Sequence, residues 1–231
     1  MALIECKSLC KRFGAQSVLN NIGLTLERGK IYGLLGKNGA GKTTLMKLMN
    51  DLLTPSAGSV LFEGAPIGIE SKKRIAFLPE RTYLDKEMTV AQTLRFFEDF
   101  YENFNTEKAR RLLADLDLSE QMKIAKMSKG MQEKLQLILV MSREADIYIL
   151  DEPLGGVDPA TREYILDTIL QNFNEHAALL ISTHMIGDIE RILDEVILIE
   201  NGCIAMQAAA DDIRNAENGS IDAYFRRRFR C

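Results

Sequence analysis

Residues 31–44, IYGLLGKNGAGKTT, form an apolar segment that runs directly into a glycine-rich loop ending in Lys-Thr. Glycine has no Cβ, so such a loop can curl around a phosphate and point several backbone N–H groups inward. A lysine at its end reaches the β- and γ-phosphates, and the hydroxyl that follows completes a Mg²⁺ shell. The pattern predicts a nucleoside triphosphate site made of Gly36, Asn38, Gly39, Ala40, Gly41, Lys42, Thr43 and Thr44.

The residues on both sides of this loop favour the same prediction. Apolar residues 31–35 predict a buried strand, and the apolar residues of segment 45–52 predict a helix that starts at the loop. The positive N-terminal end of that helix would lie beneath the phosphates. The alternative for the motif alone is a glycine-rich turn that binds no ligand.

Composition limits the class of protein. The chain has 231 residues, 46% hydrophobic content and a formal net charge of −4, so we expect a globular protein and no nucleic acid as its main partner. No apolar run approaches the roughly 20 residues that cross a bilayer. The amino terminus, MALIECKSL, has no signal-like apolar region, so we expect a cytoplasmic protein.

The order of apolar patterns predicts an α/β fold. Residues 3–13 and 18–26 resemble an antiparallel strand pair, and residues 147–150, 179–182 and 196–199 resemble buried, largely parallel strands. Between them the period becomes helical: Val90, Leu94, Phe97 and Tyr101 form an apolar stripe that Phe96, Phe100 and Phe104 widen. A second helix is predicted at about residues 106–116. We therefore expect one α/β core with a helical insertion.

Two acids follow the strand at residues 147–150. They are Asp151 and Glu152 in the sequence IYILDEP, and a central strand of this kind delivers its carboxylates to the sheet edge where a phosphate loop binds its ligand. Asp151 is then the candidate Mg²⁺ ligand, and Glu152 the candidate base that polarises a water for attack on the γ-phosphorus. The alternative is a solvated acidic turn.

A third pattern, Met-Ser-Lys-Gly-Met-Gln at residues 127–132, precedes a long apolar helix. Ser128 is a favourable N-cap, and Gly130 exposes backbone N–H groups in the first turn, so this helix start is a candidate second anion site. Two phosphate sites in one chain suggest that two chains share nucleotide. For the motif alone, a serine that caps a core helix is the simpler interpretation.

Taken in order, these motifs resemble the ATP-binding cassette (ABC) ATPases. The resemblance includes the turn GGVD at residues 155–158 and an apolar strand ending in Ser-Thr-His at residues 182–184, and it covers nearly the whole chain. It implies a P-loop NTPase core with an antiparallel β subdomain and a helical subdomain. The segments EPLGGVDPATREYILDTIL and DDIRNAENGSIDAYFRRRF resemble the ATPase subunits of bacterial exporters with separate permease chains.

The resemblance also implies roles for single residues. Phe13 matches the aromatic residue that stacks on adenine, and the phosphate loop matches throughout. Asp151 and Glu152 match the magnesium-site acid and the catalytic base. Asp158 matches the loop that faces a partner subunit, and His184 matches the switch histidine that contacts the γ-phosphate.

The chain departs from the family pattern at two places. Met-Ser-Lys-Gly-Met stands where the family usually has Leu-Ser-Gly-Gly-Gln, although Ser128 and Gly130, the γ-phosphate-binding positions, are retained. Glu80 stands where the family usually has a glutamine that links Mg²⁺ to the permease interface. A carboxylate can still coordinate Mg²⁺, but its charge would repel the γ-phosphate when the metal is absent.

The resemblance implies an ATP hydrolase that uses ATP and Mg²⁺, pairs with itself or a similar ATPase subunit, and drives an integral-membrane permease subunit. The chain would then be peripheral on the inner face of the cell membrane. We expect a single domain over residues 1–231: a core with the β subdomain (about 1–80 and 136–210), a helical subdomain (about 81–135) and a helical tail (about 211–231). The alternatives are a soluble ABC ATPase acting on DNA or ribosomes, and a small-molecule kinase.

Overall fold

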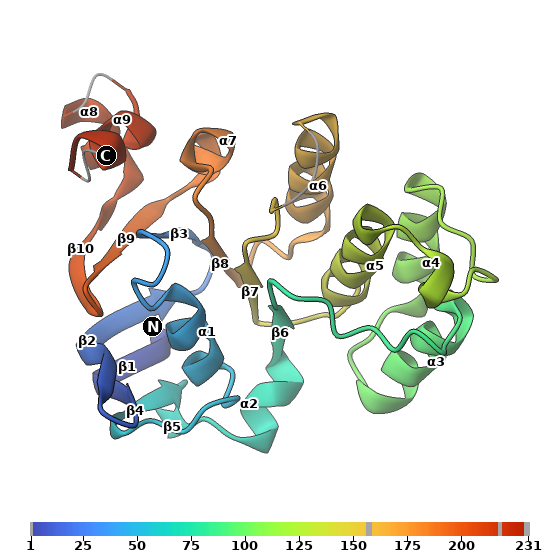
Figure 1. The fold of residues 1–231 in the computed structure, drawn as a ribbon, viewed down its shortest axis with the longest axis horizontal. Helices are drawn as coiled ribbons and strands as arrows, with labels where there is room; N and C mark the ends of the chain where they lie inside the picture. The colour runs from blue at the N-terminus through green and yellow to red at the C-terminus, as the bar shows by residue number, and fades with distance from the viewer. Residues whose placement is uncertain (1, 156–158, 217–218, 229–231) are drawn as a thin grey trace.

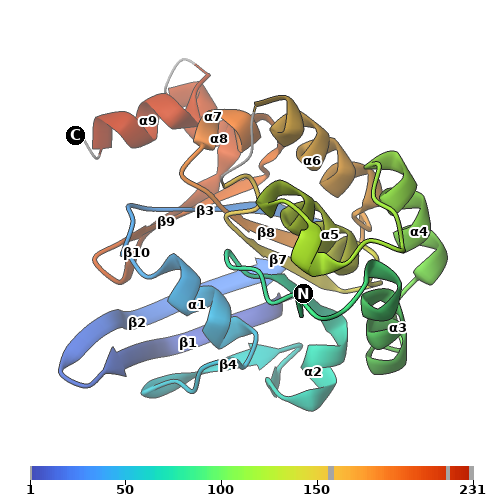
Figure 2. The same ribbon diagram turned by 45° about the vertical axis from the view of Figure 1, so that its right-hand side comes forward.

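The computed structural model describes residues 2–155, 159–216 and 219–228 and has a mixed α/β architecture with two sheets (Figure 1). The antiparallel sheet and helix α1 (Lys42–Met49) lie together, and the cluster of α3, α4 and α5 lies at the far side of the six-stranded sheet (Figures 1 and 2). The predicted fold class is confirmed.

The first sheet has the strand order β2-β1-β4-β5, from β1 (Ala2–Phe13), β2 (Gln16–Glu27), β4 (Ala57–Phe62) and β5 (Ala65–Pro66). β1 and β2 pair antiparallel, which confirms the predicted strand pair. Ile22, Leu24 and Leu26 are buried while the residues between them are exposed. This alternation places one face of the sheet against the core.

The second sheet has the order β10-β9-β3-β8-β7-β6. Five of its strands run parallel: β3 (Ile31–Leu35), β6 (Ile75–Leu78), β7 (Ile147–Asp151), β8 (Ala178–Ser182) and β9 (Glu195–Glu200). The sixth strand, β10 (Cys203–Ala209), is antiparallel to β9. The three strands predicted near residues 147, 179 and 196 are confirmed. Their carboxyl ends lie at one edge, where ligands of open α/β sheets bind.

Both faces of the second sheet are covered, which explains its continuous apolar strands. In β8, Leu180 packs with α1 and the first sheet, whereas Leu179 and Ile181 pack on the opposite side. That opposite layer holds α5 (Lys129–Met141), α6 (Pro159–Asn172), α7 (Ile186–Ile189), α8 (Ala210–Ala216) and α9 (Ile221–Arg228). Short elements α2 (Ile69–Arg74), η1 (Ile124–Lys126) and η2 (Glu190–Ile192) complete the chain.

The predicted helical insertion forms α3 (Val90–Phe100) and α4 (Thr106–Asp115). Thr89 and Gln92 form a capping box: the Gln92 N–H donates to Thr89 Oγ1 at 3.2 Å, and the Thr89 N–H donates to Gln92 Oε1 at 2.8 Å. Such reciprocal bonds fix where a helix begins. Across the described residues, no helix is long and apolar enough to cross a membrane.

The aromatic stripe of α3 differs in part from the prediction. Phe97 and Phe104 are buried, but Phe96 and Phe100 are 52% and 67% exposed and stack on each other with ring centroids 5.9 Å apart. One helix face cannot bury so many rings, so these two lie on the solvent side. Tyr83 is half-exposed, and Leu84 packs inside the core.

Candidate nucleotide-binding site

The glycine-rich loop connects the end of β3 at Leu35 to the start of α1 at Lys42. A Cβ on Gly36 would lie 2.5 Å from the Ile199 carbonyl oxygen, and one on Gly41 would lie 2.6 Å from Leu19 Cδ2. Gly41 also has φ +110°, a conformation that side chains disfavour. Both ends of the loop therefore require glycine because they pack against neighbouring strands.

Lys42 is buried within its own loop. Its Nζ donates to the Gly36 carbonyl at 2.7 Å and to the Lys37 carbonyl at 3.3 Å. Burial lowers the pKa of Lys42, and the negative charges of Glu152, Asp151 and Glu80 oppose that shift. The Lys42 ammonium and the carboxylates of Asp151, Glu152 and Glu80 are therefore close enough to interact electrostatically.

Asp151, the last residue of β7, is 1% exposed. Its Oδ1 accepts a hydrogen bond from Ser182 Oγ at 2.6 Å, and its Oδ2 is buried without a hydrogen-bond partner among the described residues. A buried carboxylate oxygen without a donor is costly unless a cation or a water occupies the space before it. Asp151 thus has the donor atom and the environment of a metal ligand.

Glu152 has φ +52°, a rare conformation for a residue with a side chain. Its N–H donates to both the Ser182 carbonyl and Ser182 Oγ at 3.1 Å, which holds the backbone in this conformation. Its Oε2 accepts the His184 backbone N–H at 3.3 Å and lies 2.8 Å from His184 Nδ1. The structure therefore brings two of the predicted catalytic residues into direct contact.

Ser182 also belongs to the site, although the sequence analysis did not identify it as a site residue. It ends β8, which pairs with β7 in the register Asp151 to Ser182. From that position its hydroxyl donates to Asp151 and accepts from the Glu152 backbone. The signal in the sequence was a hydroxyl residue at the end of an apolar strand, but its partner depends on strand order.

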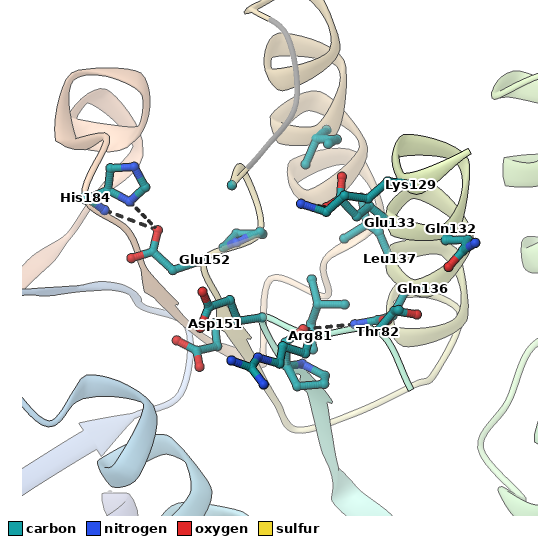
Figure 3. Close-up of a pocket in the computed structure, with 16 residues that line it drawn as sticks. Arg81, Thr82, Lys129, Gln132, Glu133, Gln136, Leu137, Asp151, Glu152 and His184 are labelled. Carbon is teal, nitrogen blue, oxygen red and sulfur yellow. Dashed lines mark hydrogen bonds and ion pairs between the residues drawn. The ribbon is translucent and has the colours of Figure 1, made fainter. Parts of the chain in front are cut away.

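A cavity of about 670 Å³ lies beside the two acids (Figure 3). One side consists of Asp151, Glu152 and His184, and the other is a face of α5 that includes Lys129, Glu133 and Gln136. The lining also includes the segment after β6, residues 78–82. Exposed Glu80 is part of that segment, so the structure places it in the same cavity as the two acids.

Ser128 and Gly130 lie at the start of α5, on either side of Lys129, which lines the cavity. Ser128 Oγ accepts the Met131 N–H at 3.2 Å, so the predicted N-cap is confirmed. Ser128 is exposed, and a Cβ added to Gly130 would meet nothing within 4 Å. Neither residue lines the cavity. Nothing within the described chain therefore explains a glycine at position 130.

The other predicted residues are spread around the loop. Asn38 and Gly39 are exposed, while Ala40, Thr43 and Thr44 are partly buried. Phe13, at the end of β1, is 47% exposed, and Lys11 Nζ lies 4.9 Å from its ring centroid. Asp158 lies outside the described residues.

Residues 19–155 match the sequence model of the family described as ABC transporter, a span of more than half of the chain. The chain belongs to the ABC transporter family. As in that family, it is an ATP-binding subunit of α/β fold. Its phosphate loop lies within the matched span.

Individual relatives support this assignment. The chain is 29% identical to the ABC transporter ATP-binding protein YtrB of Bacillus subtilis over 92% of its own length and 74% of the relative's. It is 30% identical to the Nod factor export ATP-binding protein I of Burkholderia lata, over 95% of this chain and 75% of that one. A solved ATP-binding subunit of an ABC transporter superimposes with a TM-score of 0.85 at 31% identity, covering 96% of this chain and 98% of the other.

Proposed function

We propose that the chain is the ATP-hydrolysing subunit of an ABC exporter, working as a dimer that encloses two ATP molecules and drives a separate membrane permease. The observation that carries this proposal is the contact of Glu152 with His184 beside buried Asp151, at the sheet edge that also holds the phosphate loop. Family membership makes ATP the nucleotide.

ATP would bind with its phosphates in the loop of residues 36–44. Lys42 would exchange the carbonyls of Gly36 and Lys37 for the β- and γ-phosphates, which are stronger partners for an ammonium. The exposed ring of Phe13 would stack on adenine. The α1 N-terminus adds its dipole beneath the phosphates.

Mg²⁺ fits the residues at this edge. Thr43 would supply a neutral hydroxyl, Asp151 its unpartnered Oδ2, and Glu80 a second carboxylate from across the cavity. When bound, Mg²⁺ would neutralise negative charge on the phosphates. The protein's own contribution is to hold Asp151 in one orientation through Ser182.

Glu152 would act as the base that accepts a proton from the attacking water, which it would orient in line with the γ-phosphorus. His184 would contact the γ-phosphate. Its side chain is about half-exposed and is therefore accessible to ligand from the cavity. Movement of His184 toward the phosphate would release the Glu152 carboxylate for this task.

The helix start at exposed Ser128 and partly buried Gly130 supports a shared site. Since these groups lie outside the catalytic cavity of their own chain, they would bind the γ-phosphate held by the partner. Asp158 would belong to the same dimer interface. The partner is a second copy or a similar ATPase subunit.

The permease would dock on the exposed aromatic side chains Tyr83, Phe96 and Phe100, which lie on and before α3. Export is the direction named for one relative. The chain would lie on the cytoplasmic face of the membrane through this contact. It would consist of a core (about 1–80 and 136–210), a helical subdomain (about 81–135) and a C-terminal tail (about 211–231).

The test is reconstitution with the multi-span membrane protein encoded beside this chain or co-purifying with it. We expect ATP hydrolysis that needs Lys42 and increases when the permease is present in vesicles. Absence of ATP hydrolysis by the complex, or co-purification with ribosomes or DNA instead of a membrane protein, would overturn the proposal.

A further inference from the structure

Gln136 on α5 makes a contact that none of the nucleotide-binding motifs includes. Its Nε2 donates to the Pro79 carbonyl at 2.9 Å, and the side chain is almost wholly buried, with 4% of the residue exposed. Pro79 immediately precedes Glu80 on the segment that leaves β6. Figure 3 draws this hydrogen bond as a dashed line from Gln136, among the residues that line the cavity.

The Gln136 contact matters because little else fixes this segment. Among the described residues, no other hydrogen bond joins residues 79–83 to a neighbouring element. Tyr83 adds a ring contact with Phe97, with centroids 6.4 Å apart. Between the end of β6 at Leu78 and buried Leu84, the Gln136 amide therefore supplies the hydrogen bond that holds the backbone before Glu80 beside the catalytic cavity.

The amide is not explained by packing alone. Gln136 Oε1 is buried and has no hydrogen-bond partner among the described residues, which is unfavourable for a polar atom. An apolar side chain of similar size would fill the same volume without that cost. The feature that an apolar side chain lacks is the N–H donor to Pro79.

The same helix face links two parts of the molecule. Lys129, Gln132, Glu133 and Gln136 line the cavity at the i, i+3, i+4 and i+7 positions of α5. Ser128 caps that helix about 12 Å from Gln136, at a rise of about 1.5 Å per residue. A helix of this length moves as a rigid rod, so displacement of the Ser128 end would be passed to Pro79.

We propose that Gln136 is a positioning residue that couples α5 to the Glu80 segment, so that engagement of Ser128 by nucleotide on the partner subunit sets the position of Glu80 in this subunit's cavity. The inference rests on the proposed function. It assigns Gln136 no contact with ATP, and its effect passes through the Pro79 carbonyl to Glu80.

Hydrogen exchange tests the hydrogen bond directly. We expect Gln136→Met, which keeps length and volume but has no donor, to speed exchange of the Leu84 amide in the nucleotide-free protein, because the hydrogen bond of that amide to Thr82 Oγ1 depends on the position of this segment. Gln136→Leu, which also has no donor, should do the same if the methionine variant fails to fold. Ser142→Ala is the matched control, since it removes another unpartnered buried polar atom at the end of α5. Unchanged exchange in both Gln136 variants would overturn the inference.

Magnesium dependence tests the coupling. In the dimer with ATP, Gln136→Met should raise the Mg²⁺ concentration for half-maximal hydrolysis about three- to tenfold, the size expected for one lost hydrogen bond. In a Glu80→Ala background the same change should have no effect, because the group it positions is gone. Equal shifts in both backgrounds would mean a general packing defect and would reject the positioning role.

The two proposals fail separately. If the unmodified protein does not hydrolyse ATP, the proposed function is wrong, and the positioning role of Gln136 in hydrolysis is wrong as well. The hydrogen-exchange data would still show whether Gln136 holds the segment after β6 in place. If the unmodified protein is active but Gln136→Met leaves both exchange and magnesium dependence unchanged, only the inference about Gln136 is wrong.

Discussion

His184 and Glu152 meet at the ends of two adjacent parallel strands, with His184 Nδ1 2.8 Å from Glu152 Oε2. The same carboxylate oxygen accepts the His184 backbone N–H at 3.3 Å. The carboxylate of Glu152, the proposed base, is therefore held by His184, the residue proposed to contact the γ-phosphate. We expect a γ-phosphate to compete for His184, which would link nucleotide binding to release of the base.

Replacing Glu152 by glutamine should separate binding from hydrolysis. The amide keeps the shape of the side chain but cannot accept a proton, so we expect Glu152→Gln to bind MgATP and to hydrolyse it about a hundred- to ten-thousand-fold more slowly. The ATP-bound dimer should accumulate on size-exclusion chromatography. Hydrolysis at the unmodified rate would show that Glu152 is not the base.

Mixed dimers should reveal whether Ser128 acts on the partner's nucleotide. Combining one Lys42→Ala subunit with one Ser128→Arg subunit places both lesions in one composite site and leaves the other intact. We expect about half the activity of the unmodified dimer per mixed dimer, measured on doubly tagged protein. If the two sites work independently, complete loss of hydrolysis in the mixed dimer would mean that Ser128 acts within its own chain. The homodimers of each variant serve as inactive controls.

Substitution of Glu80 tests the most evident departure from the family pattern. Glu80→Gln removes a negative charge that acts on Lys42 and lies in the same cavity as Asp151 and Glu152. The amide oxygen can still coordinate Mg²⁺, while the charge that repels the γ-phosphate before the metal arrives is gone. We therefore expect retained hydrolysis and a Mg²⁺ requirement that falls by a factor of about two to five, the effect of one charge near a protein surface. Loss of hydrolysis would instead make the carboxylate an essential ligand.

The proposed permease surface can be tested without disturbing the core. Because Leu84 is buried and Tyr83 stacks on buried Phe97, the informative changes are Phe96→Asp and Phe100→Asp at exposed positions. We expect normal nucleotide binding by the isolated subunit and loss of co-purification with the permease. Exposed Ile69, 76% accessible, is the matched control as Ile69→Asp. Co-purification that survives both aromatic changes would move the docking site elsewhere.

An ion-pair cluster predicts a pH dependence of stability. Arg74 and Arg28 both pair with Glu63 at 2.7 Å, and these contacts lower the pKa of Glu63 from 4.5 to about 2. Because the folded-state pKa is depressed, the stabilisation is present above the unfolded pKa near 4.5 and is lost as pH falls toward 2. Asp146 also pairs with both arginines and ties this cluster to β7.

Urea unfolding of the unmodified protein and Glu63→Gln should test this dependence. We expect the unmodified protein to have the higher midpoint at pH 7 and the two midpoints to converge as pH falls below about 4. High salt should reduce the difference, since these side chains are partly exposed. A difference that is independent of pH would assign the effect to packing rather than to charge.

The sequence by itself determined the elements and their chemistry. The loop of residues 36–44 requires glycine and carries its lysine in one continuous segment, so its function can be predicted from local spacing. The buried strands and capped helices follow from apolar periodicity and end signals, which are also local. Asp151 and Glu152 were predictable because both follow one recognisable strand.

Only the tertiary structure decided which side chains meet. Ser182 touches Asp151, His184 touches Glu152, and Gln136 holds Pro79, across separations of 31, 32 and 57 residues. Each contact depends on strand order or on how α5 packs against β6, and no local pattern encodes either. The exposure of Phe96 and Phe100 was also decided by tertiary packing. When a helix has more apolar residues than one face can bury, the neighbouring elements determine which of them are buried.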